Sequence, residues 1–119
     1  MNLCWKKVVK IKNPFLKDFL KQVKKIVASE EGGFTFAGGR KKNSNFLKER
    51  GLTVDNVVEA ILSLTPNDVP NGPQADRDGY EGFIYTFKSN YLADEVIYIK
   101  IRYNPPNEVV CISFHEDEI

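Results

Sequence analysis

The sequence predicts an α+β domain in which N-terminal helices pack on a small antiparallel β-sheet. Apolar residues recur at the helical period in the N-terminal half, whereas short β-rich segments fill the C-terminal third. Helices that precede strands, rather than alternate with them, are typical of the α+β class. A length of 119 residues suits one domain, 1–119. Residues 1–13 form either a short edge strand, whose lysines would suit an edge, or a tail.

The first helix has the clearest pattern. Pro14 suits a first helical turn, and Gly32 with Gly33 is expected to end the helix. Its apolar residues repeat with a 3.6-residue period and predict one buried face: Phe15, Leu16, Phe19, Leu20, Val23, Ile26 and Val27. On another face, three lysines at i, i+4 and i+7 form a stripe: Lys17, Lys21 and Lys24.

Two shorter helices are expected next. Ser44 is a suitable N-cap for a helix that runs through Arg50, with Gly51 as the residue that ends it. Thr53 caps another helix, which Pro66 stops.

A long loop and three strands complete the predicted fold. Residues 65–82 are rich in Pro, Gly, Asn and Asp, and loops of this length in compact domains are usually functional or mobile. Segments 83–88, 96–103 and 109–115 predict strands, the last of which ends the sheet. Their short connections predict an antiparallel meander.

Composition and charge narrow the function classes. The contents of 42% hydrophobic and 28% charged residues exclude a disordered chain. No run of about 18 apolar residues and no secretory signal is visible, so we expect a cytoplasmic protein without a membrane association. Residues 1–50 carry 13 Lys/Arg against 4 Asp/Glu (+9), and residues 51–119 carry 4 against 12 (−8), which sum to +1. The basic half suits a nucleic acid or an acidic partner, or is a solvated basic face with no partner.

The cysteines and the histidine predict neither a disulfide nor a structural zinc site. Cys4 and Cys111 are expected to be reduced thiols, because the chain shows no export signal. One His and two distant Cys cannot supply the four ligands of a structural zinc site. We therefore expect no cofactor.

The predicted sheet gathers chemically active side chains on one face. Along the central strand, isoleucines at 97, 99 and 101 alternate with Tyr98, Lys100 and Arg102. On the last strand, Ile112 and Phe114 share one face, and Cys111, Ser113 and His115 share the other. If the isoleucine face is the core, His115 joins Tyr98 and Lys100 on the other face. The alternative is that this is the solvated face of a two-layer protein.

Several segments together resemble the MqsR family of toxins from bacterial type II toxin–antitoxin systems. They are GLTVDNVVEAILSLTPND from position 51, IYIKI (97–101), VVCISFHEDE (109–118) and QVKKIV (22–27). The resemblance covers about 95 residues in order and spacing. It implies a two-layer, RelE-like ribonuclease fold that cleaves messenger RNA without a metal, and an antitoxin protein as partner.

The resemblance also implies site residues. Tyr98 and Lys100 match the family's YxK strand, and His115 stands where the family has the lysine of an SFK motif. Residues 68–72 (DVPNG) lack the lysine of the family's DFYKS motif, and the family's WQDVY glutamine has no counterpart near 85–86.

The residues present still suit metal-free RNA cleavage, which needs a base, an acid and cations for the developing charge. His115 would be the acid or base, since an unperturbed imidazole titrates near pH 6.5. Tyr98 would orient or donate to a phosphate oxygen. The developing charge would be neutralised by one of Lys100, Arg77 and Lys88. Asp76 or Asp78 would orient the imidazole, or instead cap the loop as turn residues.

RNA binding is assigned to a wider set: Lys17, Lys21, Lys24, Lys88, Arg102, Asp76 and Asp78. Two other functions compete. One is a metal-dependent phosphodiesterase whose ligands are Asp76, Asp78 and His115. The other is a non-catalytic RNA- or protein-binding module that uses the basic helix.

Overall fold

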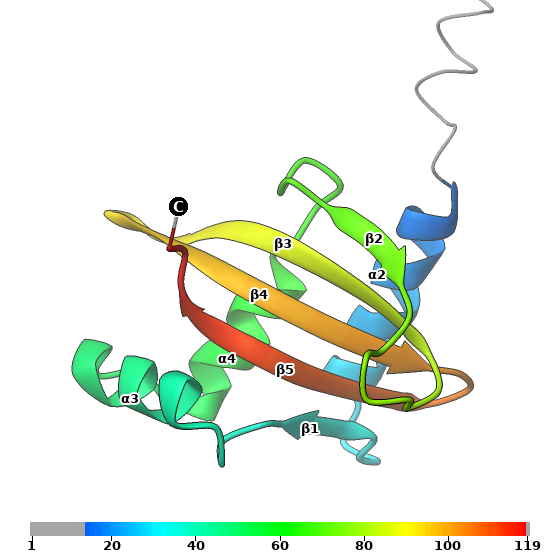
Figure 1. Ribbon diagram of the computed structural model, residues 1–119, viewed down its shortest axis with the longest axis horizontal. Coiled ribbons are helices and arrows are strands. Elements are labelled where there is room, and N and C mark those ends of the chain that lie inside the picture. The colour runs from blue at the N-terminus through cyan, green and yellow to red at the C-terminus, as the bar shows by residue number, and fades with distance from the viewer. Residues whose placement is uncertain (1–13, 119) are drawn as a thin grey trace, which may run out of the picture.

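A computed structural model describes residues 14–118, so the predicted strand or tail at 1–13 lies outside the described residues. Within these residues, three helices cover one face of a five-stranded sheet (Figure 1). The helices are α2 (Pro14–Ala28), α3 (Lys41–Arg50) and α4 (Val54–Leu62). The strands are β1 (Phe34–Phe36), β2 (Asn71–Gln74), β3 (Phe83–Leu92), β4 (Glu95–Asn104) and β5 (Glu108–Glu116). The predicted α+β class is confirmed.

The sheet is mixed rather than antiparallel. Its strand order is β1-β5-β4-β3-β2, in which β2 to β5 pair antiparallel but β1 pairs parallel with β5. The long connection through α3, α4 and the β2–β4 strands allows β1 to run in the same direction as β5. The last strand therefore does not end the sheet, because β1 lies outside it.

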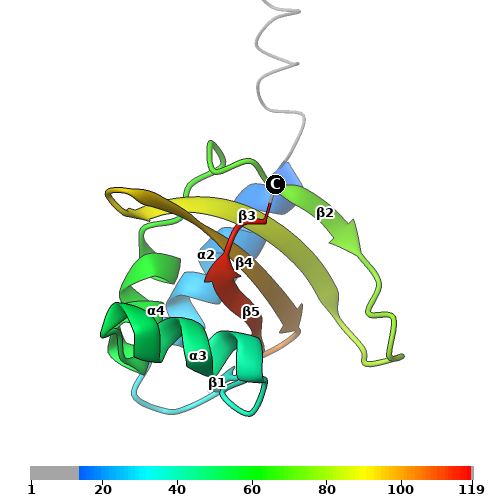
Figure 2. The same ribbon diagram turned by 60° about the vertical axis from the view of Figure 1, so that its left-hand side comes forward.

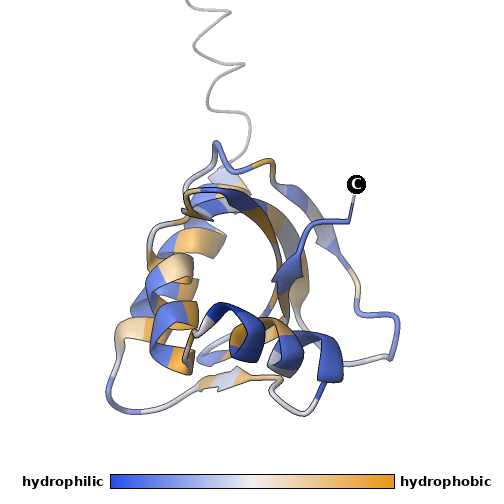
Figure 3. Ribbon diagram, turned by 90° about the vertical axis from the view of Figure 1, so that its left-hand side faces the viewer, coloured by the Kyte–Doolittle hydropathy of each residue, from blue (hydrophilic) through white to orange (hydrophobic). Residues whose placement is uncertain are grey.

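Helix α2 begins at Pro14 as predicted but ends at Ala28, before the two glycines. Its apolar face is buried against the sheet, through Leu16, Phe19, Leu20, Val23, Ile26 and Val27. Phe15, which the periodicity assigned to the same face, is 38% exposed. Apolar residues gather between the helices and the sheet, and hydrophilic ones lie outside (Figure 3).

The inner face of the sheet completes this core. Ile97, Ile99 and Ile101 of β4 are fully buried, as the alternation predicts. Aromatic rings join the two layers: the rings of Phe19 and Tyr85 lie 4.7 Å apart, and those of Phe46 and Phe114 lie 6.0 Å apart.

The ends of the two short helices agree with the prediction at Gly51 and Thr53 but not at Ser44. Helix α3 begins at Lys41, and Ser44 lies inside it, where its hydroxyl donates to the carbonyl oxygen of Arg40 instead of capping the helix. Gly51 ends α3 in the left-handed conformation, with φ of 67°, as predicted. The predicted cap at Thr53 is confirmed, and Asn56 completes a reciprocal capping box.

The predicted loop at 65–82 contains strand β2. Asn71 pairs with Thr86 of β3, and Gln74 pairs with Ile84. A segment of such composition has no strand pattern of its own, so its pairing comes from the free edge that β3 offers. Within residues 14–118 no helix has the length and apolarity needed to cross a bilayer.

Candidate functional site

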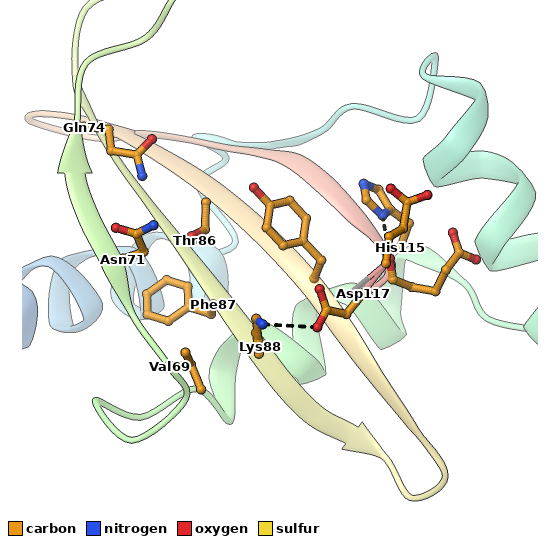
Figure 4. A pocket seen from close by; sticks show the side chains of 11 residues that line it. Val69, Asn71, Gln74, Thr86, Phe87, Lys88, His115 and Asp117 are labelled. Carbon is orange, nitrogen blue, oxygen red and sulfur yellow. Dashed lines mark hydrogen bonds and ion pairs between the residues drawn. The ribbon is translucent and has the colours of Figure 1, made fainter.

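A pocket of about 570 Å³ opens on the sheet face that the helices leave uncovered (Figure 4). The lining comes from four strands, from the loop before β2 and from the residues after β5: Val69, Asn71, Gln74, Thr86, Phe87, Lys88, Tyr98, His115, Glu116, Asp117 and Glu118. Turning the molecule shows β2 standing at the edge of this open face, away from the helices (Figure 2).

Tyr98 and His115 lie side by side in this pocket. They are paired residues of β4 and β5, and their ring centroids are 5.4 Å apart with an interplanar angle of 32°. Nδ1 of His115 lies 3.0 Å from the carbonyl oxygen of Glu116. Because a carbonyl only accepts, this hydrogen bond requires the proton on Nδ1. In the neutral ring, Nε2 then carries the free lone pair, as a general base requires.

A β-bulge interrupts β5 just before the histidine. Lys100 pairs with Ser113, whereas the next residue, Ile101, pairs with Cys111, so Ile112 is the extra residue. The predicted sharing of one face by Cys111 and His115 is therefore wrong. Cys111 lies in the core as a free thiol whose pKa is raised by burial.

Asn43 of α3 fills the gap that this bulge makes in the hydrogen bonding. Its carboxamide nitrogen donates to the carbonyl oxygen of Ile112 at 2.9 Å, and its oxygen accepts from the amide of Phe114 at 3.0 Å. The side chain is 1% exposed. A helix on the covered face thus fixes the backbone one residue before His115.

The carboxylates after His115 are each paired with a cation. Asp117 lies 3.4 Å from Lys88, and Glu118 lies 2.5 Å from Lys42. Glu116 lies 3.7 Å from Arg50, a guanidinium that also binds Glu95 through two nitrogens. The hydrogen bond from Lys42 lowers the pKa of Glu118. The negative charges of Glu116, Asp117 and Glu118 are therefore each balanced by a nearby cation.

Arg102 and Asp76 form a separate ion pair beside the pocket. Nη1 of Arg102 lies 3.0 Å from Oδ2 of Asp76, and the two side chains are 11% and 8% exposed. The ring of Tyr80 lies 4.8 Å from the guanidinium carbon. The amide of Asp78 donates to Asp76, and this bond, with the nearby Arg102, lowers the pKa of the Asp76 carboxyl.

This pair decides between the two interpretations of Asp76. Asp76 does not orient His115 but closes the loop as a turn residue, which was the alternative. Arg102 is paired with that loop, and its binding of a substrate phosphate stays a prediction.

The other predicted residues are divided between two surfaces. Lys88 lines the pocket, and Lys100 follows Tyr98 along β4, half-buried and close enough for its charge to lower the pKa of Asp76. Arg77 and Asp78 are exposed in the loop and do not line this pocket. Within residues 14–118 no three His, Cys, Asp or Glu side chains lie close enough together to hold a metal ion. The predicted ligands Asp76, Asp78 and His115 therefore do not come together as a metal site.

The lysine stripe lies on the helical layer, not on the open face. Lys17, Lys21 and Lys24 edge a shallow groove of about 330 Å³ whose other wall is Leu64, Thr65 and Pro66. Helix α2 packs on the isoleucine side of β4, whereas Tyr98 points to the opposite side. The structure thus separates the stripe from the pocket by the thickness of the sheet.

Sequence reasoning missed Asn43 and the β2 residues Asn71 and Gln74. Nothing in the sequence indicates that Asn43 is buried, because a polar residue near the start of a helix is usually solvated. Asn71 and Gln74 lay in a segment assigned to a loop, and the pairing that aims them is visible only in three dimensions.

Comparisons with protein-family models, with curated proteins and with solved structures found no match to this chain. The resemblance to MqsR toxins therefore stays a prediction, carried by the residues named for it.

Proposed function

We propose that this protein is a toxin-like endoribonuclease that cleaves messenger RNA without a metal and is neutralised by an antitoxin protein. The observation that carries the proposal is the adjacent pair of Tyr98 and His115 at an open pocket. The pair unites an imidazole, a side chain that can accept and donate a proton, with a hydroxyl donor on the neighbouring strand. The sequence resemblance to MqsR toxins supports the same reaction.

The reaction class follows from these groups. Nε2 of His115 takes the proton of a 2′-hydroxyl, whose oxygen attacks the adjacent phosphorus. The bond from phosphorus to the 5′-oxygen breaks, and the leaving oxygen takes a proton from the Tyr98 hydroxyl. The products are a 2′,3′-cyclic phosphate and a 5′-hydroxyl.

Lys88 and Lys100 supply positive charge for the phosphate. Lys88 is paired with Asp117, so a substrate phosphate at Lys88 replaces one anionic partner with another. Lys100 has no carboxylate within 4.0 Å among the described residues and lies on the same strand face as Tyr98. In the proposed reaction, both cations offset charge that develops in the transition state.

The experiment measures cleavage of labelled RNA by the full chain, with EDTA and without it. We expect cleavage in both, with cyclic-phosphate ends. His115→Ala should lower the rate at least about 100-fold, the lower range for losing a general base, at an almost unchanged thermal midpoint. Tyr98→Phe should lower kcat more than RNA affinity, because its hydroxyl acts mainly in the transition state. Tyr80→Phe, at an exposed tyrosine outside the pocket, is the matched control.

Two outcomes would overturn the proposal. Undiminished cleavage by His115→Ala removes the histidine from the mechanism. Activity that disappears in EDTA and returns with Mg²⁺ or Mn²⁺ shows a metal-dependent reaction.

A non-catalytic RNA- or protein-binding module remains the second candidate. The lysine stripe favours it, because no carboxylate of residues 14–118 lies within 4.0 Å of these three lysines. Binding of RNA without cleavage by the wild-type chain would select it.

A further inference from the structure

Strand β2 carries an irregularity that aims two carboxamides into the pocket. Asn71 pairs with Thr86 and Gln74 with Ile84, so three steps along β2 match two steps along β3. In a regular strand, residues three positions apart point to opposite faces. The extra residue of the bulge reverses that relation, and both side chains line the pocket (Figure 4). Bulges of this kind re-aim side chains beside active sites.

The close approach of β2 to β3 depends on Gly72. A Cβ atom at this position would lie 2.5 Å from the carbonyl oxygen of Ile84 and 2.9 Å from Cδ1 of Tyr85. Its φ of 151° also favours glycine. The β2 backbone is thereby held at the edge of the sheet with Asn71 and Gln74 on either side of the bulge.

Both carboxamides are free to bind a ligand. Asn71 and Gln74 are exposed, and within residues 14–118 no hydrogen bond of the structure uses either side chain. Each carboxamide presents a donor and an acceptor next to each other, the arrangement that matches the edge of a nucleobase. Between them and His115 lie the sheet residues Thr86 and Lys88, which also line the pocket.

The charges divide the pocket into two halves. The side near His115 holds charged groups, namely Lys88 and the cation-paired carboxylates of Glu116, Asp117 and Glu118, whereas the β2 side presents the neutral carboxamides of Asn71 and Gln74. The volume of about 570 Å³ lies inside the range of roughly 300 to 1,000 Å³ of small-molecule sites, enough for one nucleoside. With a phosphate at the Tyr98–His115 side, the β2 side is the part of the pocket that is left for an adjacent base.

We propose that Asn71 and Gln74 determine specificity by reading the base next to the cleaved phosphate of single-stranded RNA. This inference rests on the proposed ribonuclease function and names its specificity element. Splayed bases of single strands are the usual target of sequence-specific RNA recognition, through hydrogen bonds to their edges.

The test uses oligodeoxynucleotides that contain one ribonucleotide, so that only one bond can be cleaved. Sixteen versions vary the base at that ribonucleotide and at the next position. For the full chain we expect kcat/KM to differ at least about 10-fold between the best and worst base at one of the two positions, the range for a bidentate base contact. Asn71→Ala combined with Gln74→Ala should reduce this ratio to within about 3-fold, as expected when neutral hydrogen bonds are lost.

Two further variants distinguish a loss of base recognition from a loss of folding. Asn71→Asp and Gln74→Glu keep the size but remove the donor, so they should change which base is preferred rather than flatten the preference. Asn45→Ala, at an exposed asparagine of α3 outside the pocket, should leave the ratio unchanged. A ratio that persists in the double alanine variant while cleavage continues would overturn the inference and leave the ribonuclease function standing.

If the wild-type chain cleaves no RNA, the ribonuclease function fails by itself. Fluorescence anisotropy with four all-deoxy oligonucleotides, which differ in one central base, then tests the inference separately. A preference of about 10-fold for one base that disappears in the double alanine variant supports base reading. Equal affinities for all four oligonucleotides overturn it.

Discussion

The two faces of the sheet are built from different interactions. On the covered face, Phe19, Tyr85 and the β4 isoleucines pack without solvent between the layers. On the open face, neighbouring side chains are joined by ion pairs, such as Arg102 with Asp76, and by the ring contact of Tyr98 with His115. Apolar burial supplies most of the free energy of folding, whereas each single polar contact supplies much less. Stability and chemistry should therefore be separable by substitution.

Asn43 connects the two faces, so it is the position where stability and chemistry should not be separable. It belongs to a helix of the covered face, but its hydrogen bonds hold the strand that carries His115. Substitutions at Asn43 should affect both properties, whereas those on either side of it should affect one.

The largest expected effect is on the covered face. Phe19 is fully buried, and its ring lies 4.7 Å from that of Tyr85 and 6.1 Å from that of Tyr103. Phe19→Ala should lower the free energy of unfolding by about 3–5 kcal/mol, measured by urea denaturation. The half-exposed Phe15, as Phe15→Ala, is the control and should cost much less. Loss of cleavage under conditions where Phe19→Ala is still folded would contradict the separation of the faces.

Asn43→Ala should have the next largest effect and should break the separation. It leaves the Ile112 carbonyl and the Phe114 amide without their partner, which costs about 1–3 kcal/mol of unfolding free energy. Because β5 then holds His115 less firmly, kcat should fall while KM changes little. Asn45→Ala on the exposed side of the same helix is the control. A normal kcat in Asn43→Ala would show that the histidine does not depend on this bridge.

A smaller effect is expected from the open-face ion pair. Asp76→Asn should lower the free energy of unfolding at neutral pH by about 0.5–1.5 kcal/mol, because the side-chain oxygen of Asn still accepts hydrogen bonds but the charge that faces Arg102 is lost. The folded-state pKa of Asp76 is lowered, first by the Asp78 amide and then by Arg102. Its stabilisation is therefore complete above the unfolded pKa of about 3.9 and is lost as the pH falls through the lower, folded value.

Urea titrations of wild type and Asp76→Asn across pH 2 to 7 measure this difference. The two curves should converge toward the acid end. Asp78→Asn, which removes a carboxylate without a cation partner among residues 14–118, should run parallel to wild type. A constant gap between wild type and Asp76→Asn would show that the loss is not electrostatic.

The covered face could be predicted from the sequence, and much of the open face could not. The face of α2 and the alternation of β4 are periodic, so local spacing places Leu16 or Ile99 correctly. The bulges of β2 and β5 have no such signature, because each arises from pairing with a strand that is distant in sequence. Prediction therefore placed Tyr98 and His115 on one face of the sheet but misplaced Cys111, which lies just before the β5 bulge.

The charged residues show the same limit. The sequence supplies many Asp, Glu, Lys and Arg residues, but which of them pair depends on the folded positions of the loops. Arg102 meets Asp76 across 26 residues, and Glu118 meets Lys42. Some cations that the sequence assigned to a phosphate, such as Arg102 and Lys88, are therefore already paired with a carboxylate of the protein.

The smallest expected effect concerns the lysine stripe on the far side of the molecule. Because Lys17, Lys21 and Lys24 edge a groove on the helical layer, an RNA of about five nucleotides in the pocket should not reach them. Replacing all three with Gln should leave the affinity and the cleavage of this short RNA unchanged.

For an RNA of about 30 nucleotides, the slope of log affinity against log salt should flatten by about two units in the triple variant, given roughly 0.7 per phosphate contact on single strands. The rate at saturating RNA should persist, because phosphate contacts position the strand without taking part in the reaction. An unchanged slope for the long RNA, together with escape from neutralisation by an acidic antitoxin, would assign the stripe to the protein partner instead.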